Sequence, residues 1–254
     1  MTAWLDGRMV PESALPRRVG TAPFETMGAR QAELPLWDLH LARLQQAATR
    51  LGLPFAAAPA WRAAASELLR GNGHGDAILR LSLVPTGAAV HPVMVTRARS
   101  PIRVVQLLPT IVERPADAPP GDLKAEPRAY YDAVRQQAQD GGADDGLVID
   151  PDGAVLEAAL GNLWLRLDGV WVTPALDGRV LPGIARGLLL AAAARRGQAF
   201  AERRCDLADL HRASALAHSN AVHGPRPATL VGQPAAVEIV DRELGPLWHA
   251  ASAH

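Results

Sequence analysis

The chain has 254 residues, of which 48% are hydrophobic and 20% charged, a balance that fits one large or two modest globular domains. Its 26 basic and 26 acidic residues give a formal net charge of zero, so the electrostatic signature of a nucleic-acid-binding protein is missing. Cys205 is the single cysteine, which excludes an internal disulfide and a cysteine metal cluster. The N-terminal residues lack a secretion-signal pattern, and the longest apolar run, residues 188–194, is too short to span a bilayer. We therefore expect a cytoplasmic protein with no nucleic-acid partner, no membrane partner and no metal site.

Residues 1–112 are predicted to form a small N-terminal α+β domain. Asp6-Gly7 between apolar residues predicts a hairpin over residues 4–10. Leucines and alanines at helical spacing predict a helix that has Asp38 as its N-cap and stops before Gly52. The other elements expected here are a helix at 60–69 and strands at 24–27, 77–84, 91–96 and 102–108. Residues 113–123 are rich in Pro, Asp and Ala and are predicted to be an interdomain linker.

Residues 124–254 are predicted to form a larger C-terminal domain. Helices are expected at 129–139, 184–196 and 206–212. Strands are expected at 146–150, 155–160, 163–167, 170–173, 215–220, 226–231 and 236–240. Turn signals such as Pro151-Asp152-Gly153 separate several of these strands. The whole chain is thus predicted to be α+β with two domains.

Lys124 is the only lysine in the chain. Lysine and arginine together number 26, so the other 25 basic residues are all arginine. Arginine can replace lysine wherever only positive charge is needed, but guanidinium cannot lose its proton and attack a carbonyl. A single retained lysine therefore indicates nucleophilic or Schiff-base chemistry. An accidental surface lysine fits this one fact equally well.

Glu157 interrupts a strand that otherwise reads as apolar. A carboxylate inside such a strand costs several kcal/mol unless it has a partner, and one such partner is a protonated pyridine nitrogen. Alternation by itself favours another interpretation, in which Glu157 lies on the wet face of an antiparallel sheet.

Two further stretches have features of a phosphate site. Gly183 precedes a predicted helix, whose first N–H groups and positive dipole end attract anions. Arg43 lies beside the apolar stripe of its helix, from where a guanidinium can reach a phosphate with two hydrogen bonds. A surface arginine and an ordinary helix start are the commoner explanations.

Taken together and in order, these motifs resemble the fold-type IV enzymes that use pyridoxal 5'-phosphate (PLP). This family includes branched-chain aminotransferases, D-amino acid aminotransferases and aminodeoxychorismate lyases. The resemblance covers nearly the whole chain. The matching motifs are Phe24-Glu25-Thr26-Met27, His40-Leu-Ala-Arg43-Leu44, Lys124, Glu157-x-x-x-x-Asn162-Leu163, Thr173-Pro174, Leu181-Pro-Gly-Ile-x-Arg186 and Ser219-Asn220-Ala221.

The resemblance implies a cofactor, a dimer and a set of site residues. Lys124 would be the Schiff-base lysine and Glu157 would face the pyridine nitrogen of PLP. Arg43 would hold the phosphate, together with the amides of Ile184 and Ala185. The implied cofactor-binding set is Arg43, Lys124, Tyr131, Glu157, Asn162, Gly183, Ile184, Ala185, Asn220 and Ala221, with Lys124 as the catalytic residue. A homodimer acting on a small amino substrate is also implied.

Within the family, the chain is most similar to the lyase branch. Asn220-Ala221-Val222 and the spacing of Lys124 to Arg128 follow that branch, and the Arg-x-His carboxylate site of D-amino acid aminotransferases is missing. The resemblance therefore implies an aminodeoxychorismate lyase of folate biosynthesis, which converts 4-amino-4-deoxychorismate to 4-aminobenzoate and pyruvate. A class IV aminotransferase acting on D-amino or branched-chain amino acids is the alternative. Ala185 and Ala221 replace hydroxyl residues of some relatives, so a non-catalytic binding scaffold is a second alternative.

Overall fold

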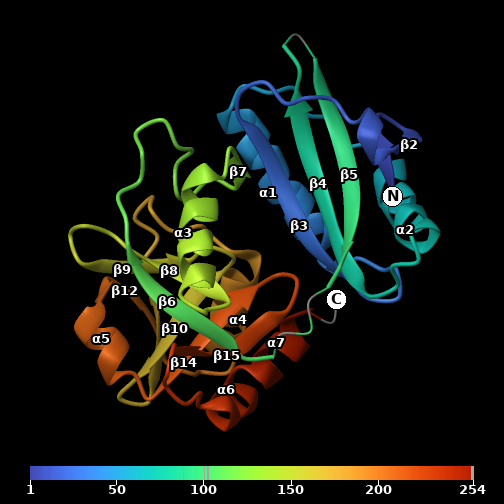
Figure 1. Cartoon of the computed structure of the whole chain (residues 1–254). Coiled ribbons are helices and arrows are strands. Elements are labelled where there is room, and N and C mark those ends of the chain that lie inside the picture. The colour runs from blue at the N-terminus through green and yellow to red at the C-terminus, as the bar shows by residue number, and fades with distance from the viewer. Residues whose placement is uncertain (88, 100, 102, 253–254) are drawn as a thin grey trace. The chain divides into compact units, whose positions relative to one another are not determined.

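The computed structural model describes residues 1–87, 89–99, 101 and 103–252, which fall into two compact units (Figure 1). Of these described residues, the first unit takes those within 1–101 and 123–127, and the second takes those within 103–122 and 128–252. The chain thus returns to the first unit once, for the short segment that contains Lys124. Each unit has its own sheet and its own hydrophobic core.

The first unit is an antiparallel sheet covered by two helices (Figure 1). Its strand order is β2-β1-β5-β4-β3-β7. The strands are β1 (Thr2–Leu5), β2 (Arg8–Pro11), β3 (Ala22–Ala29), β4 (Ala77–Pro85), β5 (Val90–Ala98) and β7 (Ala125–Glu126). The helices are α1 (Trp37–Arg50) and α2 (Ala60–Gly71), and a short 3-10 helix, η1, covers Glu12–Ala14.

The core of the first unit is formed by alternating apolar residues of its strands and by the apolar faces of its helices. Leu79, Leu81 and Leu83 alternate along β4 and are buried on the face that packs against the helices. Leu44 of α1 and Leu68 of α2 join the same cluster, because each lies on the apolar side of its amphipathic helix. This packing fixes α1 against β3.

The second unit is a mixed nine-stranded sheet with order β12-β11-β10-β14-β15-β6-β8-β9-β13. The strands are β6 (Val105–Ile111), β8 (Asp145–Ile149), β9 (Ala154–Ala158), β10 (Asn162–Leu167), β11 (Val170–Pro174), β12 (Phe200–Arg203), β13 (Cys205–Asp206), β14 (Ala215–Asn220) and β15 (Gly224–Leu230). The helices are α3 (Ala129–Asp140), α4 (Ile184–Arg195), α5 (Leu207–Arg212), α6 (Val237–Glu243) and α7 (Gly245–Ser252). Leu147 and Ile149 of β8 face one core cluster, whereas Val148 faces α3, so the middle of this sheet is buried on both sides.

A bulge in β9 changes the direction of its side chains. Leu147 pairs with Ala158 and Ile149 with Val155, so β9 has one residue more than β8 over this stretch. Val155 and Ala158 accordingly pack into the same hydrophobic cluster although they are three positions apart. Strict alternation therefore fails at Glu157, which lies inside the bulge.

Most predicted elements are present within a few residues, and two predictions were wrong. Residues 236–240 were predicted as a strand but form the N-cap and first turn of α6, and Val240 and the C-cap residue Leu244 are buried at helical spacing. A short apolar run does not distinguish a strand from a helix. Asp38 is not the N-cap of α1, since the cap is Leu36 and Asp38 lies in the first turn. Within the described residues, every helix falls short of the length and apolarity that a membrane span requires.

The two units also differ from the predicted division at 1–112, 113–123 and 124–254. The β6 strand pairs with β8 and β15, so it belongs to the second unit. The amide of Asp122 donates to the carbonyl of Gly178 at 3.2 Å, within that same unit. Ala125 and Glu126 instead pair with β3, which places Lys124 with the first unit.

Candidate active site

In the first unit, a buried glutamate binds two side chains of α1. Glu25 lies on β3 with 1% of its surface exposed. Arg43 contacts both carboxylate oxygens, with Nε 2.8 Å from Oε1 and Nη2 2.6 Å from Oε2. His40 Nδ1 lies 2.6 Å from Oε2. Because His40 and Arg43 are three residues apart on α1, both side chains reach the same carboxylate.

The charges of this cluster are set by burial and by the ion pair. Burial alone would raise the pKa of Glu25, but the charge and hydrogen bonds of Arg43, with the hydrogen bond from His40, lower this pKa to about 2. Burial lowers the pKa of His40, and Glu25 only partly opposes this effect. At pH 7 His40 is therefore neutral and Glu25 is an anion. The bidentate pair fixes the orientation of the Arg43 guanidinium.

The backbone of Lys124 is hydrogen-bonded to β3, the strand that contains Glu25. It directly precedes β7, and its carbonyl accepts a hydrogen bond from the amide of Phe24 at 3.1 Å. Its Nζ lies 4.7 Å from the centre of the Phe24 ring. Arg80 of β4 stacks on the same ring at 3.7 Å and pairs with Glu126. Local strand pairing thus sets the position of the lysine backbone.

In the second unit, Glu157 is buried and accepts hydrogen bonds from two side chains and a backbone amide. Its side chain is 4% exposed. Tyr131 Oη lies 2.7 Å from Oε1, while Asn162 Nδ2 and the amide of Leu181 each lie 3.2 Å from Oε2. The wet-face interpretation of Glu157 was therefore wrong, because the bulge in β9 and the cover from α3 exclude water there.

Asn162 connects Glu157 to the start of α4. Its Nδ2 also donates to the carbonyl of Leu181 at 2.9 Å. A Cβ atom on Gly183 would clash with Asn162 Oδ1, so glycine at this position lets Asn162 keep its place. Gly183 is the N-cap of α4 and makes no side-chain capping bond, and Ile184 and Ala185 form the first helical turn. The site therefore includes a helix N-terminus with its positive dipole end.

The turn after β14 lies against the same region. Asn220 Oδ1 accepts hydrogen bonds from the amides of Val222 and His223, which fixes the turn that contains Ala221. Asn220 Nδ2 donates to the carbonyl of Leu160 at 3.1 Å, two residues before Asn162. The β10–β14 register pairs Asn162 with Ser219.

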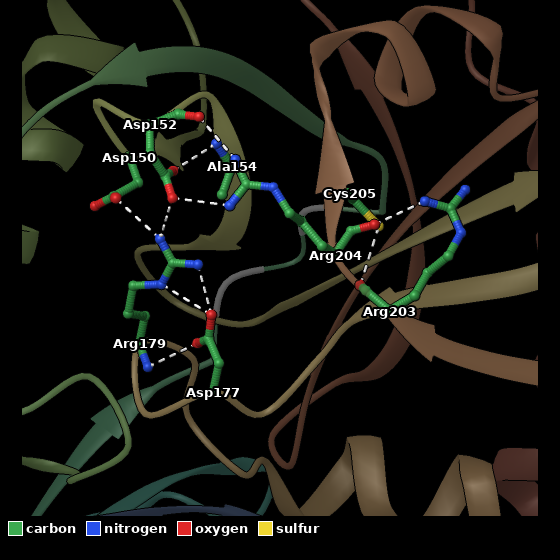
Figure 2. A network of polar contacts seen from close by, with 8 residues as sticks. All are labelled: Asp150, Asp152, Ala154, Asp177, Arg179, Arg203, Arg204 and Cys205. Atoms are coloured by element: carbon green, nitrogen blue, oxygen red, sulfur yellow. Dashed lines mark hydrogen bonds and ion pairs between the residues drawn. The ribbon is translucent and has the colours of Figure 1, made fainter.

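An arginine–aspartate network anchors the loop that supplies the Leu181 amide (Figure 2). Arg179 Nη1 lies 2.9 Å from Asp150 Oδ2 and 3.0 Å from Asp152 Oδ2, and Arg179 Nε lies 2.9 Å from Asp177 Oδ2. Arg204 also binds Asp152, at 2.8 Å. The hydrogen bond from Arg204 is the main reason that the pKa of Asp152 is lowered.

The structure divides the predicted site residues between the two units. Arg43 and Lys124 lie in the first unit, and the other predicted residues lie in the second. Sequence reasoning missed Glu25, Leu181 and Arg114, whose Nη2 donates to Tyr131 Oη at 2.8 Å. A polar residue in an apolar strand was a usable signal for Glu25. Leu181 acts through its backbone, and Arg114 lies in a segment predicted to be a linker. Neither residue therefore had a signal in the sequence.

Residues 22–231 match the family model for amino-transferase class IV. The chain belongs to the class IV aminotransferase family. A branched-chain-amino-acid aminotransferase from Pseudomonas aeruginosa is 39% identical over 69 residues, a stretch that covers 27% of this chain and 22% of that enzyme.

Two solved structures similar to this class IV aminotransferase chain cover nearly its whole length. A Legionella pneumophila protein named "Putative 4-amino-4-deoxychorismate lyase" has a TM-score of 0.81 at 22% identity, and the match covers 94% of this chain and 97% of that one. A hypothetical aminotransferase from Mycobacterium tuberculosis, in a PLP-bound form, has a TM-score of 0.84 at 22% identity, with 99% and 98% covered. The predicted fold-type IV architecture is confirmed. Enzymes of this family depend on PLP, so the predicted enzyme class and cofactor are confirmed at the level of the family.

Gly183→Ala should destabilise the second unit, whereas Gly187→Ala should not. The new methyl group at position 183 displaces Asn162 and breaks its bonds to Glu157 or Leu181, at a cost of about 1–3 kcal/mol. Nothing lies within 4 Å of a Cβ at Gly187, inside the same helix. Alanine there should stabilise by up to about 1 kcal/mol. Urea unfolding of the two variants checks this, and equal stabilities would contradict the packing at Gly183.

Glu25→Gln should weaken the first unit at neutral pH and reduce its acid sensitivity. Loss of one partner of a buried ion pair costs about 3–5 kcal/mol. Since the pKa of Glu25 is lowered to about 2 in the folded chain, its contribution is complete above the unfolded pKa and is lost as pH falls towards 2.

Hydrogen exchange of α1 amides measures this effect between pH 7 and pH 3. The protection difference between wild type and Glu25→Gln should shrink as pH falls, because only the wild type loses the charged pair. A difference that stays constant with pH would show that the charge of Glu25 does not stabilise α1.

Proposed function

We propose that this chain is a PLP-dependent lyase that converts 4-amino-4-deoxychorismate to 4-aminobenzoate and pyruvate. The buried carboxylate of Glu157, stabilised by three donors, is the observation that carries the PLP assignment to this chain. The lyase assignment is supported by the Asn220-Ala221-Val222 motif and by the spacing of Lys124 to Arg128. It is also supported by the likeness of fold to the Legionella pneumophila protein.

The donor set fits the chemical groups of PLP. A buried anionic carboxylate suits a protonated ring nitrogen, since each stabilises the charged form of the other. The first turn of α4, whose N-cap lacks a side-chain capping bond, suits a phosphate, and the cradle at Gly183 keeps Asn162 in place beside it. Arg43 adds a guanidinium that Glu25 has already oriented.

Each residue then has a defined role. The phosphate would be held by Arg43, by the amides of Ile184 and Ala185, and by the turn at Asn220 and Ala221. Glu157 keeps the ring nitrogen protonated, with Asn162 and Tyr131 fixing its carboxylate and Gly183 admitting the close approach. PLP held by these residues would supply an electron sink for the electron pair that is left when a bond to the substrate's amine-bearing carbon breaks.

Lys124 would supply the primary amine to which the cofactor is joined, and this amine would later move a proton. In the lyase reaction the amine-bearing ring carbon loses its proton, and the bond between the ring and the enolpyruvyl oxygen breaks. Lys124 accepts the first proton and returns one to the departing group, which becomes pyruvate. The ring is left aromatic as 4-aminobenzoate, so atoms and charge balance.

A PLP-dependent aminotransferase is the second candidate. The 39% identity with part of a branched-chain aminotransferase favours it, and it needs the same roles for Lys124 and Glu157. A non-catalytic scaffold is motivated only by Ala185 and Ala221. We also propose a homodimer, as the resemblance implies, and light scattering of the purified chain tests this.

Reduction of the PLP-loaded chain with borohydride should attach the cofactor to Lys124. Because Lys124 is the only lysine, the N-terminal amine is the only other primary amine in the chain. Peptide mass spectrometry should find the adduct on residue 124 in the wild type. Lys124→Arg, which keeps the charge, should carry no adduct there and have no activity. An adduct elsewhere, or turnover by Lys124→Arg, would refute the assigned role.

Incubation with two kinds of substrate separates lyase from aminotransferase. A lyase should release 4-aminobenzoate from 4-amino-4-deoxychorismate and should not convert the cofactor to its pyridoxamine form with single amino acids. Both are followed by absorbance and chromatography, with Lys124→Arg as the blank. Rapid conversion by branched-chain or D-amino acids, without release of 4-aminobenzoate, would establish the aminotransferase instead.

A further inference from the structure

A tyrosine hydroxyl connects a guanidinium to the carboxylate of Glu157 in the second unit. Arg114, in the segment between β6 and β7, donates from Nη2 to Tyr131 Oη at 2.8 Å. Tyr131 Oη lies 2.7 Å from Glu157 Oε1. The three groups therefore form a chain of two short hydrogen bonds that ends at the buried carboxylate.

The chemistry of arginine sets the direction of this chain. A guanidinium has five N–H donors and no acceptor, so Tyr131 Oη must be the acceptor in its bond with Arg114. The single hydroxyl hydrogen of Tyr131 is then directed at Glu157. Donation by a charged group polarises the hydroxyl and strengthens the second bond. If Glu157 were protonated, the hydroxyl hydrogen of Tyr131 would lose its anionic acceptor.

We propose that Arg114 and Tyr131 are positioning residues that keep Glu157 ionised and fix its rotamer, so that it can hold a protonated ring nitrogen. This inference rests on the proposed function and deepens it. It assigns a role to Arg114, a residue outside the predicted cofactor-binding set.

The surroundings of Arg114 and Tyr131 are consistent with a rigid relay. Arg114 Nη1 donates to the carbonyl of Pro119 at 2.9 Å, and its guanidinium lies 4.3 Å from the Tyr130 ring and 5.0 Å from the Tyr131 ring. Burial, and next the charge of Glu157, raise the pKa of Tyr131, while Arg114 opposes the rise. The hydroxyl therefore keeps its hydrogen at any pH at which the chain functions.

Two other charged groups act on this cluster. Arg128 lies 5.0 Å from the Tyr131 ring and donates to the carbonyl of Ala159. Asp150 contributes to the raised pKa of Tyr130, after burial, and is itself bound by Arg179. Arg128 and Asp150 are the same in the wild type and in the variants at Tyr131 and Arg114, so their effects cancel when these chains are compared.

The side-chain carboxyl signal of Glu157 in 13C-glutamate-labelled full-length chain tests the proposal without added PLP. Glu157→Gln identifies the signal. In Tyr131→Phe and Arg114→Met, the signal should titrate at least about one pH unit higher than in the wild type, because one charge-stabilising donor is lost or weakened. Arg114→Lys should shift it less, since an ammonium also donates to the hydroxyl.

Matched controls remove similar groups from the same unit. Tyr130→Phe deletes a hydroxyl from the adjacent position on α3, and Arg103→Met removes an exposed arginine that pairs with Asp241. Neither should move the Glu157 signal. Circular dichroism establishes whether each variant is folded. If Arg114→Met does not fold, the milder variants Tyr131→Phe and Arg114→Lys still test the proposal.

Loading with PLP labelled with 15N in its ring separates this inference from the proposed function. In Tyr131→Phe and Arg114→Met the ring nitrogen should lose its proton at lower pH than in the wild type, although the adduct on Lys124 still forms. A wild type that forms no adduct overturns the proposed function. A Glu157 signal that titrates at the same pH in the wild type, Tyr131→Phe and Arg114→Met overturns the relay, whether or not PLP binds to the chain.

Discussion

Glu157 brings a negative charge into a strand that is buried on both faces, and the local structure of the second unit is arranged around that charge. A carboxylate removed from water costs several kcal/mol unless donors replace the lost hydration. Its donors come from α3, from the start of β10 and from the loop before α4. Burial of β9 therefore depends on all three segments being in place. The contacts that permit the buried charge also bring Gly183 and the first turn of α4 beside it, so fold and site are stabilised by the same bonds.

The two buried glutamates accept hydrogen bonds from different kinds of donor. Glu25 meets the guanidinium of Arg43 directly, and the pair is nearly neutral as a unit. Glu157 accepts hydrogen bonds from a hydroxyl, an amide side chain and a backbone amide, and each of these donors stabilises its negative charge. A direct ion pair suits a residue whose task is to orient an arginine. In the proposed function the charge of Glu157 acts on a cationic ring, and donors that stabilise the anion suit that role.

The sequence predicts the helices, most strands and the order of the motifs, because periodicity and turn residues are local signals. It does not predict that Glu157 is buried, since the bulge in β9 depends on the register with β8. It also misassigns residues 236–240, where a short apolar run fits a strand or a helix equally. The roles of Glu25 and Arg114 depend on partners 15 or more residues away in the chain, as the separations of 18 to Arg43 and 17 to Tyr131 show. Such pairings follow from tertiary packing and have no local pattern.

The use of basic residues in this chain separates electrostatic roles from chemical ones. Arg43, Arg114 and Arg179 each bind two or more acceptors in a planar fork, which a flexible ammonium would do less well. Arginine thus meets the structural demands for positive charge, and nothing in those positions requires a proton to be lost. Lys124 differs because its backbone is fixed by pairing with β3 while its side chain has an amine that can become neutral and nucleophilic. The proposed function accounts for the one lysine in this arginine-rich chain, because it assigns to Lys124 a reaction for which charge alone is not sufficient.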